Sequence, residues 1–341
     1  MSNSMFDSLL EEMDATSGAP TTMSGKKLTN TALVNELLSS MMNVIAGFNG
    51  DMIADMIMPK IKERVEKEIG VIPRRIEVRT GDQVKIVQGV THEVFKPVLD
   101  MVSADIPVYL TGKAGTGKNV ICKQVAEALG LPFYFTNAVT QEYKLTGFID
   151  ANGKYQETQF YKAFTGGGLF FLDEMDASVP ETLVILNAAI ANKYFDFPCG
   201  KVDANPNFRV IAAGNTLGTG ADINYTGRYS LDRASLDRFA LIEVNYSREI
   251  EKAITFQNEA LVDFAEAFRK VCEDAGIECL CSYRALDRIS KLEPIMKNLP
   301  EIIEICLLKG LDKDSRQIIK NKMKDQKGMV ANAYYEALVK L

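Results

Sequence analysis

The chain has 341 residues, of which 47% are hydrophobic, and its formal net charge is -6. A chain of this length has room for about two domains, and this composition predicts a folded globular protein rather than a disordered one. The acidic balance excludes a surface that binds nucleic acid merely by being basic, although a local basic channel stays open.

Cysteine and histidine usage argues against a structural zinc site. The six cysteines form no CxxC pair, and the chain has a single histidine, so no zinc-finger spacing can be written. We expect free thiols in a reducing cytoplasm. The first residues are acidic without a basic region, and polar residues interrupt the most apolar early stretch, residues 41–58. We therefore expect neither a signal peptide nor a membrane span.

The amino-terminal quarter of the chain precedes the main pattern. Residues 1–28 are rich in small polar residues and have little periodicity, which predicts a mobile leader. Residues 29–88 form an accessory segment in our interpretation. Apolar residues recur at helical spacing over 29–68, and two alternating stretches, 75–79 and 83–87, indicate a short hairpin.

From residue 89 to 246, short apolar strands alternate with helices, which is typical of an α/β domain with a mostly parallel sheet. The pattern then becomes wholly helical from 247 to 341. We predict one helix over 248–275, ended by Gly276, and a second from a Ser282 cap to Leu292. The five expected strands are 107–110, 133–135, 169–172, 210–213 and 241–244.

A glycine-rich loop lies between the first of these strands and a helical stretch over 120–129. Glycines let consecutive backbone N–H groups curl around a polyphosphate, and the helix N-terminus adds a partial positive charge. Lys118 stands where a lysine can reach the β- and γ-phosphates. The predicted ATP cradle consists of Gly112, Lys113, Ala114, Gly115, Thr116, Gly117, Lys118 and Asn119.

Asn119 departs from the usual form of this loop, in which Ser or Thr donates a hydroxyl oxygen to Mg²⁺. An amide oxygen is also a hard ligand, so Asn119 could hold the ion directly or through water, although its side chain is longer. The sequence thus supports nucleotide binding more directly than metal-dependent hydrolysis.

Two further strand ends carry polar side chains. The run Gly168 to Leu172 ends in Asp173 and Glu174, which beside the glycine loop would orient the Mg²⁺ shell and polarise the attacking water. Asn215 follows the strand over 210–213, at the edge where ligands bind in open α/β sheets. The alternatives are a solvated acidic turn and a turn-forming asparagine.

Taken in order, GKAGTGKN, LFFLDEMD, VIAAGNT, SLDRASLDRFA and SYRAL resemble the successive motifs of an AAA+ ATPase. The resemblance covers residues 90–294. The spellings are similar to the MoxR-like branch, which includes proteins of the NorQ, CbbQ and CobS type and phage-encoded relatives. This resemblance implies an α/β fold: a P-loop AAA+ core with a parallel five-stranded sheet, followed by an all-helical lid.

The resemblance also implies roles for particular residues. Asp173 and Glu174 match the metal and water carboxylates, and Asn215 matches the first sensor. Arg238 matches the arginine finger that acts on a neighbouring subunit's γ-phosphate, with Arg233 as a second such residue. The alternative is that these two are ordinary surface arginines. Finally, Arg284 matches the second sensor, a cis arginine of the lid.

The sequence leaves two possible roles open for each of two hairpins and for one histidine. The hairpins over 145–155 and 194–202 resemble inserts that face a pore or a partner in the family. Their candidate contacts are Phe148, Lys154, Tyr155 and Lys201, but Phe148 and Phe197 could equally pack their own hairpins. His92 lies where the adenine would rest, and the alternative is a surface histidine that starts a helix.

These features predict an ATP- and Mg²⁺-dependent remodelling ATPase that works as a homo-oligomeric ring, and the hexamer is the family's usual form. In MoxR-like systems the protein client often comes through a neighbouring von Willebrand A domain protein. One alternative is a scaffold that assembles with ATP and hydrolyses it poorly. Another is a nucleic-acid motor, which the acidic balance disfavours.

Overall fold

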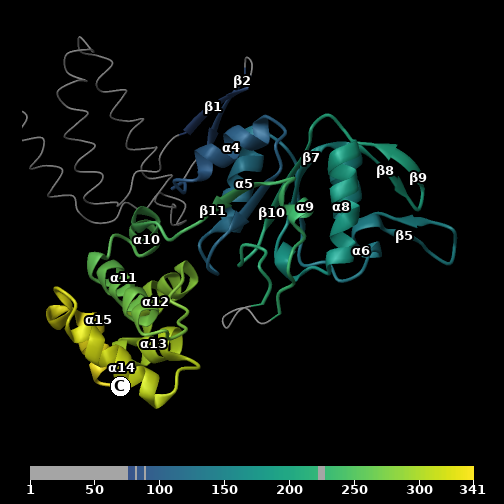
Figure 1. Ribbon diagram of the computed structural model, residues 1–341. Helices are drawn as coiled ribbons and strands as arrows, with labels where there is room; N and C mark the ends of the chain where they lie inside the picture. The colour runs from purple at the N-terminus through teal and green to yellow at the C-terminus, as the bar shows by residue number, and fades with distance from the viewer. Residues whose placement is uncertain (1–75, 81–82, 88–89, 222–226) are drawn as a thin grey trace, which may run out of the picture. The chain divides into compact units, whose positions relative to one another are not determined.

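The computed structural model describes residues 76–80, 83–87, 90–221 and 227–341 (Figure 1). The expected leader and the helices predicted over 29–68 lie outside these residues. The chain divides into two units, 1–69 and 70–341, and every described residue belongs to the second. The predicted hairpin is present as β1 (Ile76–Thr80), which pairs antiparallel with β2 (Gln83–Val87).

A five-stranded sheet forms the centre of the α/β region. Its strands stand in the order β11-β3-β10-β7-β4, and all neighbouring pairs are parallel. This arrangement confirms the predicted parallel sheet, and the strands fall within one or two residues of the expected ranges. The strands are β3 (Val108–Thr111), β4 (Phe133–Thr136), β7 (Gly168–Leu172), β10 (Phe208–Ala213) and β11 (Ala240–Glu243).

Helices cover both faces of the sheet (Figure 1). On one face, α4 (Phe95–Ser103) and α5 (Lys118–Leu129) pack on alternate strand residues such as Val108 and Leu110. On the other, α7 (Gln159–Gly166) and α8 (Pro180–Asn192) pack on the residues between them, such as Tyr109. Both faces are therefore apolar, which is why these strands read as continuous apolar runs.

Two hairpins extend from the α8 side of the core (Figure 1). They are β5 (Phe148–Ile149) with β6 (Tyr155–Gln156), preceded by α6 (Tyr143–Thr146), and β8 (Tyr194–Phe197) with β9 (Gly200–Asp203).

The two hairpins differ in how they use their aromatic residues. Phe197 is buried against Phe160 and Phe164 of α7, and within its own hairpin it contacts Phe195. Phe148, in contrast, is 48% exposed and meets only the edge of Tyr143 among ring contacts in the described residues.

The helical region after the sheet has its own apolar core. Its elements are α10 (Arg248–Ile254), α11 (Glu259–Asp274), α12 (Tyr283–Met296), α13 (Leu299–Ile303), the π-helical turn η2 (Glu304–Leu308), α14 (Lys313–Lys324), the 3₁₀ turn η3 (Met329–Ala331) and α15 (Ala333–Val339).

The single helix predicted over 248–275 is wrong. Phe256 and Gln257 adopt positive φ angles of 53° and 65°, which end α10, and Asn258 then caps α11 by accepting a hydrogen bond from the Leu261 N–H. The predicted end of α12 at Leu292 is also too early, because the helix continues through Pro294 to Met296. No helix in the described part of the chain is long and apolar enough to cross a bilayer.

Candidate functional site

The glycine loop joins β3 to α5 with the sharp bends that its sequence predicts. Gly112 has φ +139°, and a Cβ there would lie 2.3 Å from the carbonyl oxygen of Val244, the residue that follows β11. Only glycine therefore fits at this position of the loop. Gly117, at φ +89°, is the residue before the first turn of α5. The loop therefore stands at the N-terminus of a twelve-residue helix, a geometry suited to an anion.

Lys118 is held inside this loop. It is 7% exposed, and its Nζ donates to the carbonyl oxygens of Gly112 (2.7 Å) and Lys113 (3.1 Å) and to Asn215 Oδ1 (3.2 Å). Burial lowers the pKa of Lys118 to about 8, against the opposing effect of the Asp173 carboxylate. A cation in so dry a place gains more from a phosphate than an exposed one would.

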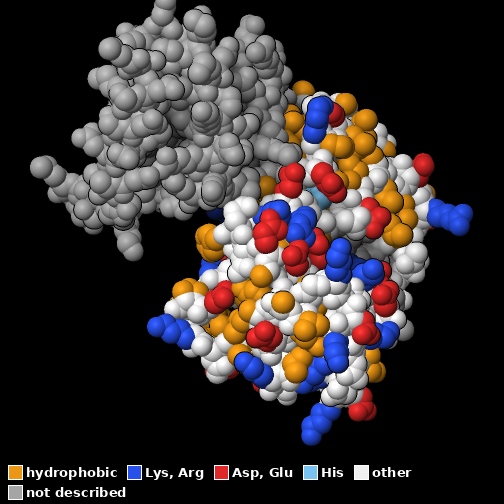
Figure 2. All heavy atoms as spheres, turned by 90° about the vertical axis from the view of Figure 1, so that its left-hand side faces the viewer, with side chains coloured by type: hydrophobic (Ala, Val, Ile, Leu, Met, Phe, Trp, Pro, Cys, Tyr) orange, Lys and Arg blue, Asp and Glu red, His pale blue; other side chains and the backbone are white. Residues whose placement is uncertain are grey.

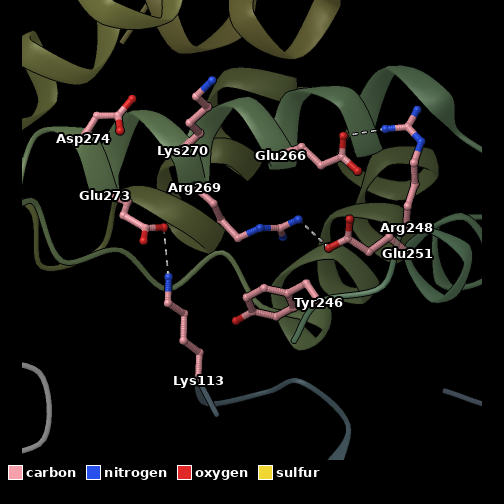
Figure 3. Close-up of a pocket in the computed structure, with 9 residues that line it drawn as sticks. All are labelled: Lys113, Tyr246, Arg248, Glu251, Glu266, Arg269, Lys270, Glu273 and Asp274. Atoms are coloured by element: carbon pink, nitrogen blue, oxygen red, sulfur yellow. Dashed lines mark hydrogen bonds and ion pairs between the residues drawn. The ribbon is translucent and has the colours of Figure 1, made fainter. Parts of the chain in front are cut away.

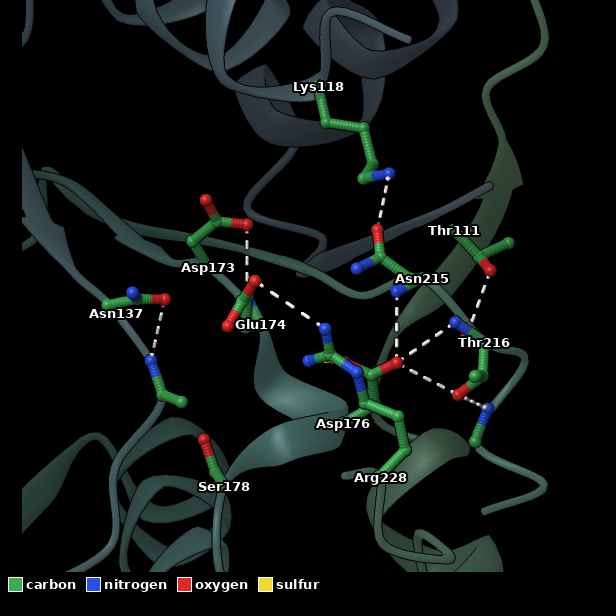
Figure 4. A network of polar contacts seen from close by, with 12 residues as sticks. Thr111, Lys118, Asn137, Asp173, Glu174, Asp176, Ser178, Asn215, Thr216 and Arg228 are labelled. Carbon is green, nitrogen blue, oxygen red and sulfur yellow. Dashed lines mark hydrogen bonds and ion pairs between the residues drawn. The ribbon is translucent and has the colours of Figure 1, made fainter. Parts of the chain in front are cut away.

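The carboxylates at the end of β7 lie beside the loop (Figure 4). Asp173 Oδ2 accepts from Asn119 Nδ2 (2.9 Å), and its Oδ1 accepts the Glu174 N–H (3.0 Å). The backbone of Glu174 adopts a left-handed conformation, with φ 52°. Together with the contact between Lys118 and Asn215, these bonds bring the sequence-predicted phosphate, metal, base and sensor residues to one edge of the sheet.

These donors fit a magnesium ion that is held largely by the nucleotide. Mg²⁺ in nucleotide sites takes one or two protein oxygens together with phosphate and water oxygens. Asp173 supplies such an oxygen, and no group of three or more His, Cys, Asp or Glu in the described ranges could hold a metal by itself. Asn119 faces Asp173 with its amide nitrogen, so its amide would have to turn to offer an oxygen.

Two residues that the sequence reasoning missed complete this network. Asp176 is fully buried, and its Oδ2 accepts from the Asn215 N–H, the Thr216 N–H and the Thr216 hydroxyl, each at 2.9 Å. Its Oδ1 lies 3.1 Å from Arg228 Nη1, and Arg228 Nη2 lies 3.5 Å from Glu174 Oε1. Asp176 shares the acidic run after β7, which could have drawn notice, whereas Arg228 lies in a loop with no periodic pattern.

Asp176 should be a strong determinant of stability. We expect Asp176→Ala to lower the free energy of unfolding by about 4 kcal/mol, because it removes the buried carboxylate that Arg228 Nη1 and two backbone N–H groups bind. Urea denaturation measures this loss. The matched control is Asp100→Ala, since the only ion pair of Asp100 within the described residues is an exposed one with Lys96, which should contribute about 0.5 kcal/mol at most. Equal losses in the two variants would contradict the role given to Asp176.

Arg238 lies away from this edge, and Arg233 lies five residues before it in the chain. Arg233 begins the short helix α9 (Arg233–Leu236), and Arg238 follows it, with its Nη1 donating to the Ala234 carbonyl. Both side chains are exposed. Arg238 precedes the start of β11, and β11 runs parallel to β3, whose end opens the phosphate loop. Because these strands span about 10 Å, Arg238 lies near the opposite edge of the sheet from Lys118.

The helical region touches the phosphate loop at the start of α12. The Tyr283 N–H donates to the Gly115 carbonyl (3.3 Å), and the Tyr246 hydroxyl donates to the Ala114 carbonyl (3.0 Å). Arg284 is exposed in the first turn of α12, with its Nε 3.5 Å from where a Cβ on Gly115 would stand. The predicted second sensor is thus placed next to the loop.

A hollow of about 320 Å³ lies between the loop and the helical region (Figure 3). Its charged groups are largely neutralised in pairs, with Arg269 on Glu251 at 2.7 Å and Lys113 on Glu273 at 3.2 Å. The lining residues are Lys113, Tyr246, Arg248, Glu251, Glu266, Arg269, Lys270, Glu273 and Asp274. The Lys113 pair is exposed on both sides and contributes little to stability.

His92 is not a surface histidine, so the alternative considered from the sequence is wrong. It is 3% exposed, its Nε2 lies 2.8 Å from the Asn245 carbonyl oxygen, and its Nδ1 accepts the Val94 N–H (3.2 Å). The ring thus joins the chain before α4 to the chain after β11. The expectation that His92 lies at the adenine stays a prediction.

One known protein family matches most of the α/β region. Residues 107–239 match the family described as AAA domain (dynein-related subfamily). That range contains the glycine loop, the carboxylates after β7, Asn215, Arg228 and Arg238. The MoxR-like branch stays a prediction.

Individual relatives are more distant. An uncharacterized protein of Staphylococcus saprophyticus is 26% identical over 253 residues, which cover 67% of this chain and 93% of that protein. An uncharacterized protein of Staphylococcus epidermidis is 28% identical over 256 residues, with the same coverage. Among solved structures, NtrX from Brucella abortus has a TM-score of 0.42 and 16% identity over 85% of this chain and 66% of that one, which is too low to carry an argument.

The family match and the architecture agree. The matched range contains four strands of the parallel sheet, the fifth follows directly, and the helical region comes after it. The chain therefore has the fold of an AAA+ ATPase core followed by a helical lid.

Proposed function

We propose that this protein is a Mg²⁺-dependent ATPase that works as a ring of identical subunits and remodels a macromolecular client in the cytoplasm. The observation that carries the proposal is the gathering of Lys118, Asp173, Glu174 and Asn215 at one edge of the sheet. These are the groups that phosphoryl transfer to water needs: a cation for the phosphates, a carboxylate for the metal, a carboxylate for the water, and an amide to hold the water or the γ-phosphate.

Each residue has a separate task in this scheme. The loop and Lys118 hold the β- and γ-phosphates, and Asp173 orients the shell of the Mg²⁺ ion, which would neutralise charge on those phosphates. Glu174 accepts the proton of the attacking water as that water bonds to the γ-phosphorus and ADP leaves. Asn215, bonded to Lys118, is placed to hold the water or the γ-phosphate through its amide.

The position of Arg238 supports a ring. A guanidinium stays charged and spreads its donors over several phosphate oxygens, which suits it to stabilise the transferring phosphoryl group. Because Arg238 is exposed near the opposite edge of the sheet from Lys118, we infer that it serves the site of a neighbouring subunit. Arg233, exposed at the start of α9, would stand beside it.

Phosphate release tests the ATPase function. We expect the protein to release phosphate from ATP only with Mg²⁺, and Glu174→Gln to lower kcat by about a hundredfold while ATP affinity stays within about twofold, since Gln keeps the shape but cannot accept the proton. Equilibrium titration with ATP and steady-state phosphate assays measure both. The proposal fails if the oligomer shows no Mg²⁺-dependent turnover that Glu174→Gln abolishes.

An ATP-gated scaffold is the second candidate function, and one contact favours it. Asn119 turns its amide nitrogen toward Asp173, where other loops of this type offer a hydroxyl oxygen to the metal. A protein that assembles with ATP but shows no turnover in the phosphate assay would fit this reading.

For the client, we propose only its class, which is a protein. The exposed side chains of Phe148 and Ile149, at 48% and 51% exposure, support a protein contact at the β5–β6 hairpin, reached directly or through a von Willebrand A domain protein. Where Figure 2 draws described residues, acidic and basic side chains are interleaved. Stimulation of turnover by DNA or RNA, stronger at low salt, would instead indicate a nucleic-acid motor.

A further inference from the structure

The contact between Arg228 and Glu174 has no part in the chemistry above, although it touches the proposed general base (Figure 4). Arg228 comes from the loop between β10 and α9, far from Glu174 in sequence. Its side chain is 11% exposed, against 41% for Glu174. A largely buried cation thus meets the carboxylate that has to face the attacking water.

We propose that Arg228 is a positioning residue for ATP hydrolysis, one that holds the Glu174 carboxylate in place while Asp176 holds Arg228. The proposal rests on the ATPase function proposed above. Arg228 acts through Glu174 and is assigned no contact with the nucleotide.

The anchoring of Arg228 is firm enough for this task. Its Nη1 lies 3.1 Å from Asp176 Oδ1, and the next residue, Tyr229, donates its N–H to the Asp176 carbonyl oxygen at 2.7 Å. A further bridge joins Thr219 to Ser230 across the loop. Both the guanidinium and the backbone beside it are therefore fixed to the segment that carries Glu174.

The shape of the guanidinium explains why an arginine is needed. Its planar fork presents separate nitrogens, so Nη1 can bind Asp176 while Nη2 points to Glu174. Neutralising Asp176 would take only one of these nitrogens. The second contact acts on Glu174, whose left-handed backbone already sets it apart from Asp173.

Asp176 also connects this pair to the phosphate side of the site. Its Oδ2 accepts the Asn215 N–H, and Asn215 in turn accepts from Lys118. A single buried carboxylate thus sets the positions of both the base and the sensor. Arg228 is the connection from Asp176 to the base, so its loss should misplace Glu174 without disturbing the phosphate loop.

Substitution of Arg228 in the full chain tests this inference. We expect Arg228→Gln to lower kcat by on the order of tenfold to a hundredfold, with KM and the ATP dissociation constant changed by less than about threefold, because misplacement of a catalytic group slows chemistry more than binding. Arg228→Lys should fold like the parent and recover only part of kcat, because one ammonium cannot span both carboxylates. It also keeps the test decisive if the Gln variant does not fold.

Two controls separate positioning from a structural role. Arg209→Gln removes another largely buried arginine. Arg209 lies at the start of β10 and donates to the Val102 carbonyl oxygen of α4 (3.0 Å). This variant should keep the parent's kcat. In a Glu174→Gln background, Arg228→Gln should change the residual rate by less than about twofold, because both variants then remove the same function.

Three results would overturn the inference. The first is an unchanged kcat in both Arg228 variants while the parent shows Glu174-dependent turnover, which leaves the proposed ATPase function intact. The second is an undiminished effect of Arg228→Gln in the Glu174→Gln background. The third is a loss of affinity for ATP but not ADP, which would mean direct contact with the γ-phosphate. A parent without Glu174-dependent turnover would instead remove the ATPase function, and this inference with it.

Discussion

Lys118→Ala is expected to weaken ATP binding about a thousandfold, or about 4 kcal/mol, because it removes the buried ammonium that would face the phosphates in the proposed site. Lys118 is 7% exposed, and a carbonyl oxygen of the loop holds its Nζ in position. Water in the space left by the substitution would not supply the lost positive charge. Calorimetric or fluorescence titration with ATP and ADP measures the loss. Turnover should vanish with it.

The control for this change is Lys123→Ala. Lys123 is exposed on the same helix, α5, and its removal should leave ATP affinity within about twofold. If Lys118→Ala still bound ATP as tightly as the Lys123 variant, the phosphate site would lie elsewhere in the molecule.

Arg238→Ala should leave ATP binding unchanged and lower kcat by about a thousandfold. An arginine that reaches the γ-phosphate only in the transition state contributes to the rate rather than to affinity, and arginine fingers contribute on the order of 10³ or more. Nucleotide titration and steady-state phosphate release on the same oligomer give both quantities.

Arg288→Ala is the matched control, because Arg288 is an exposed arginine on α12 to which no role in the site is assigned. It should keep both affinity and kcat. A normal kcat for Arg238→Ala would show that Arg238 is an ordinary surface arginine, the alternative that its sequence context left open.

The sheet was predictable because its chemistry is repetitive. Each strand is a short apolar run, and the side chains that the site needs follow directly after β3, β7 and β10. Since parallel strands end at one edge, order along the chain was enough to predict that Lys118, Asp173 and Asn215 converge. The break between α10 and α11 was not predictable, because it depends on Phe256 and Gln257 adopting a conformation that their residue types do not favour.

The unpredicted parts of the site depend on contacts between distant residues. Arg228 contacts Glu174 and Asp176, which lie more than fifty residues earlier in the chain. No local sequence pattern predicts contacts of this kind. A surface position for His92 was one alternative because it stands before a helix, yet the residue is buried and contacts the Asn245 carbonyl oxygen, 153 residues later. Asn119 was considered as a metal ligand, and its contact with Asp173 shows which of its amide atoms faces the carboxylate.

An ATPase site that two subunits complete can be tested by mixing two inactive variants. Subunits with Glu174→Gln keep Arg238, and subunits with Arg238→Ala keep Glu174, so mixed rings contain some sites with both groups intact. We predict that equal mixing restores phosphate release to roughly a tenth or more of the parent rate, while each variant alone stays near background. No recovery from rings shown to contain both variants would contradict a shared site.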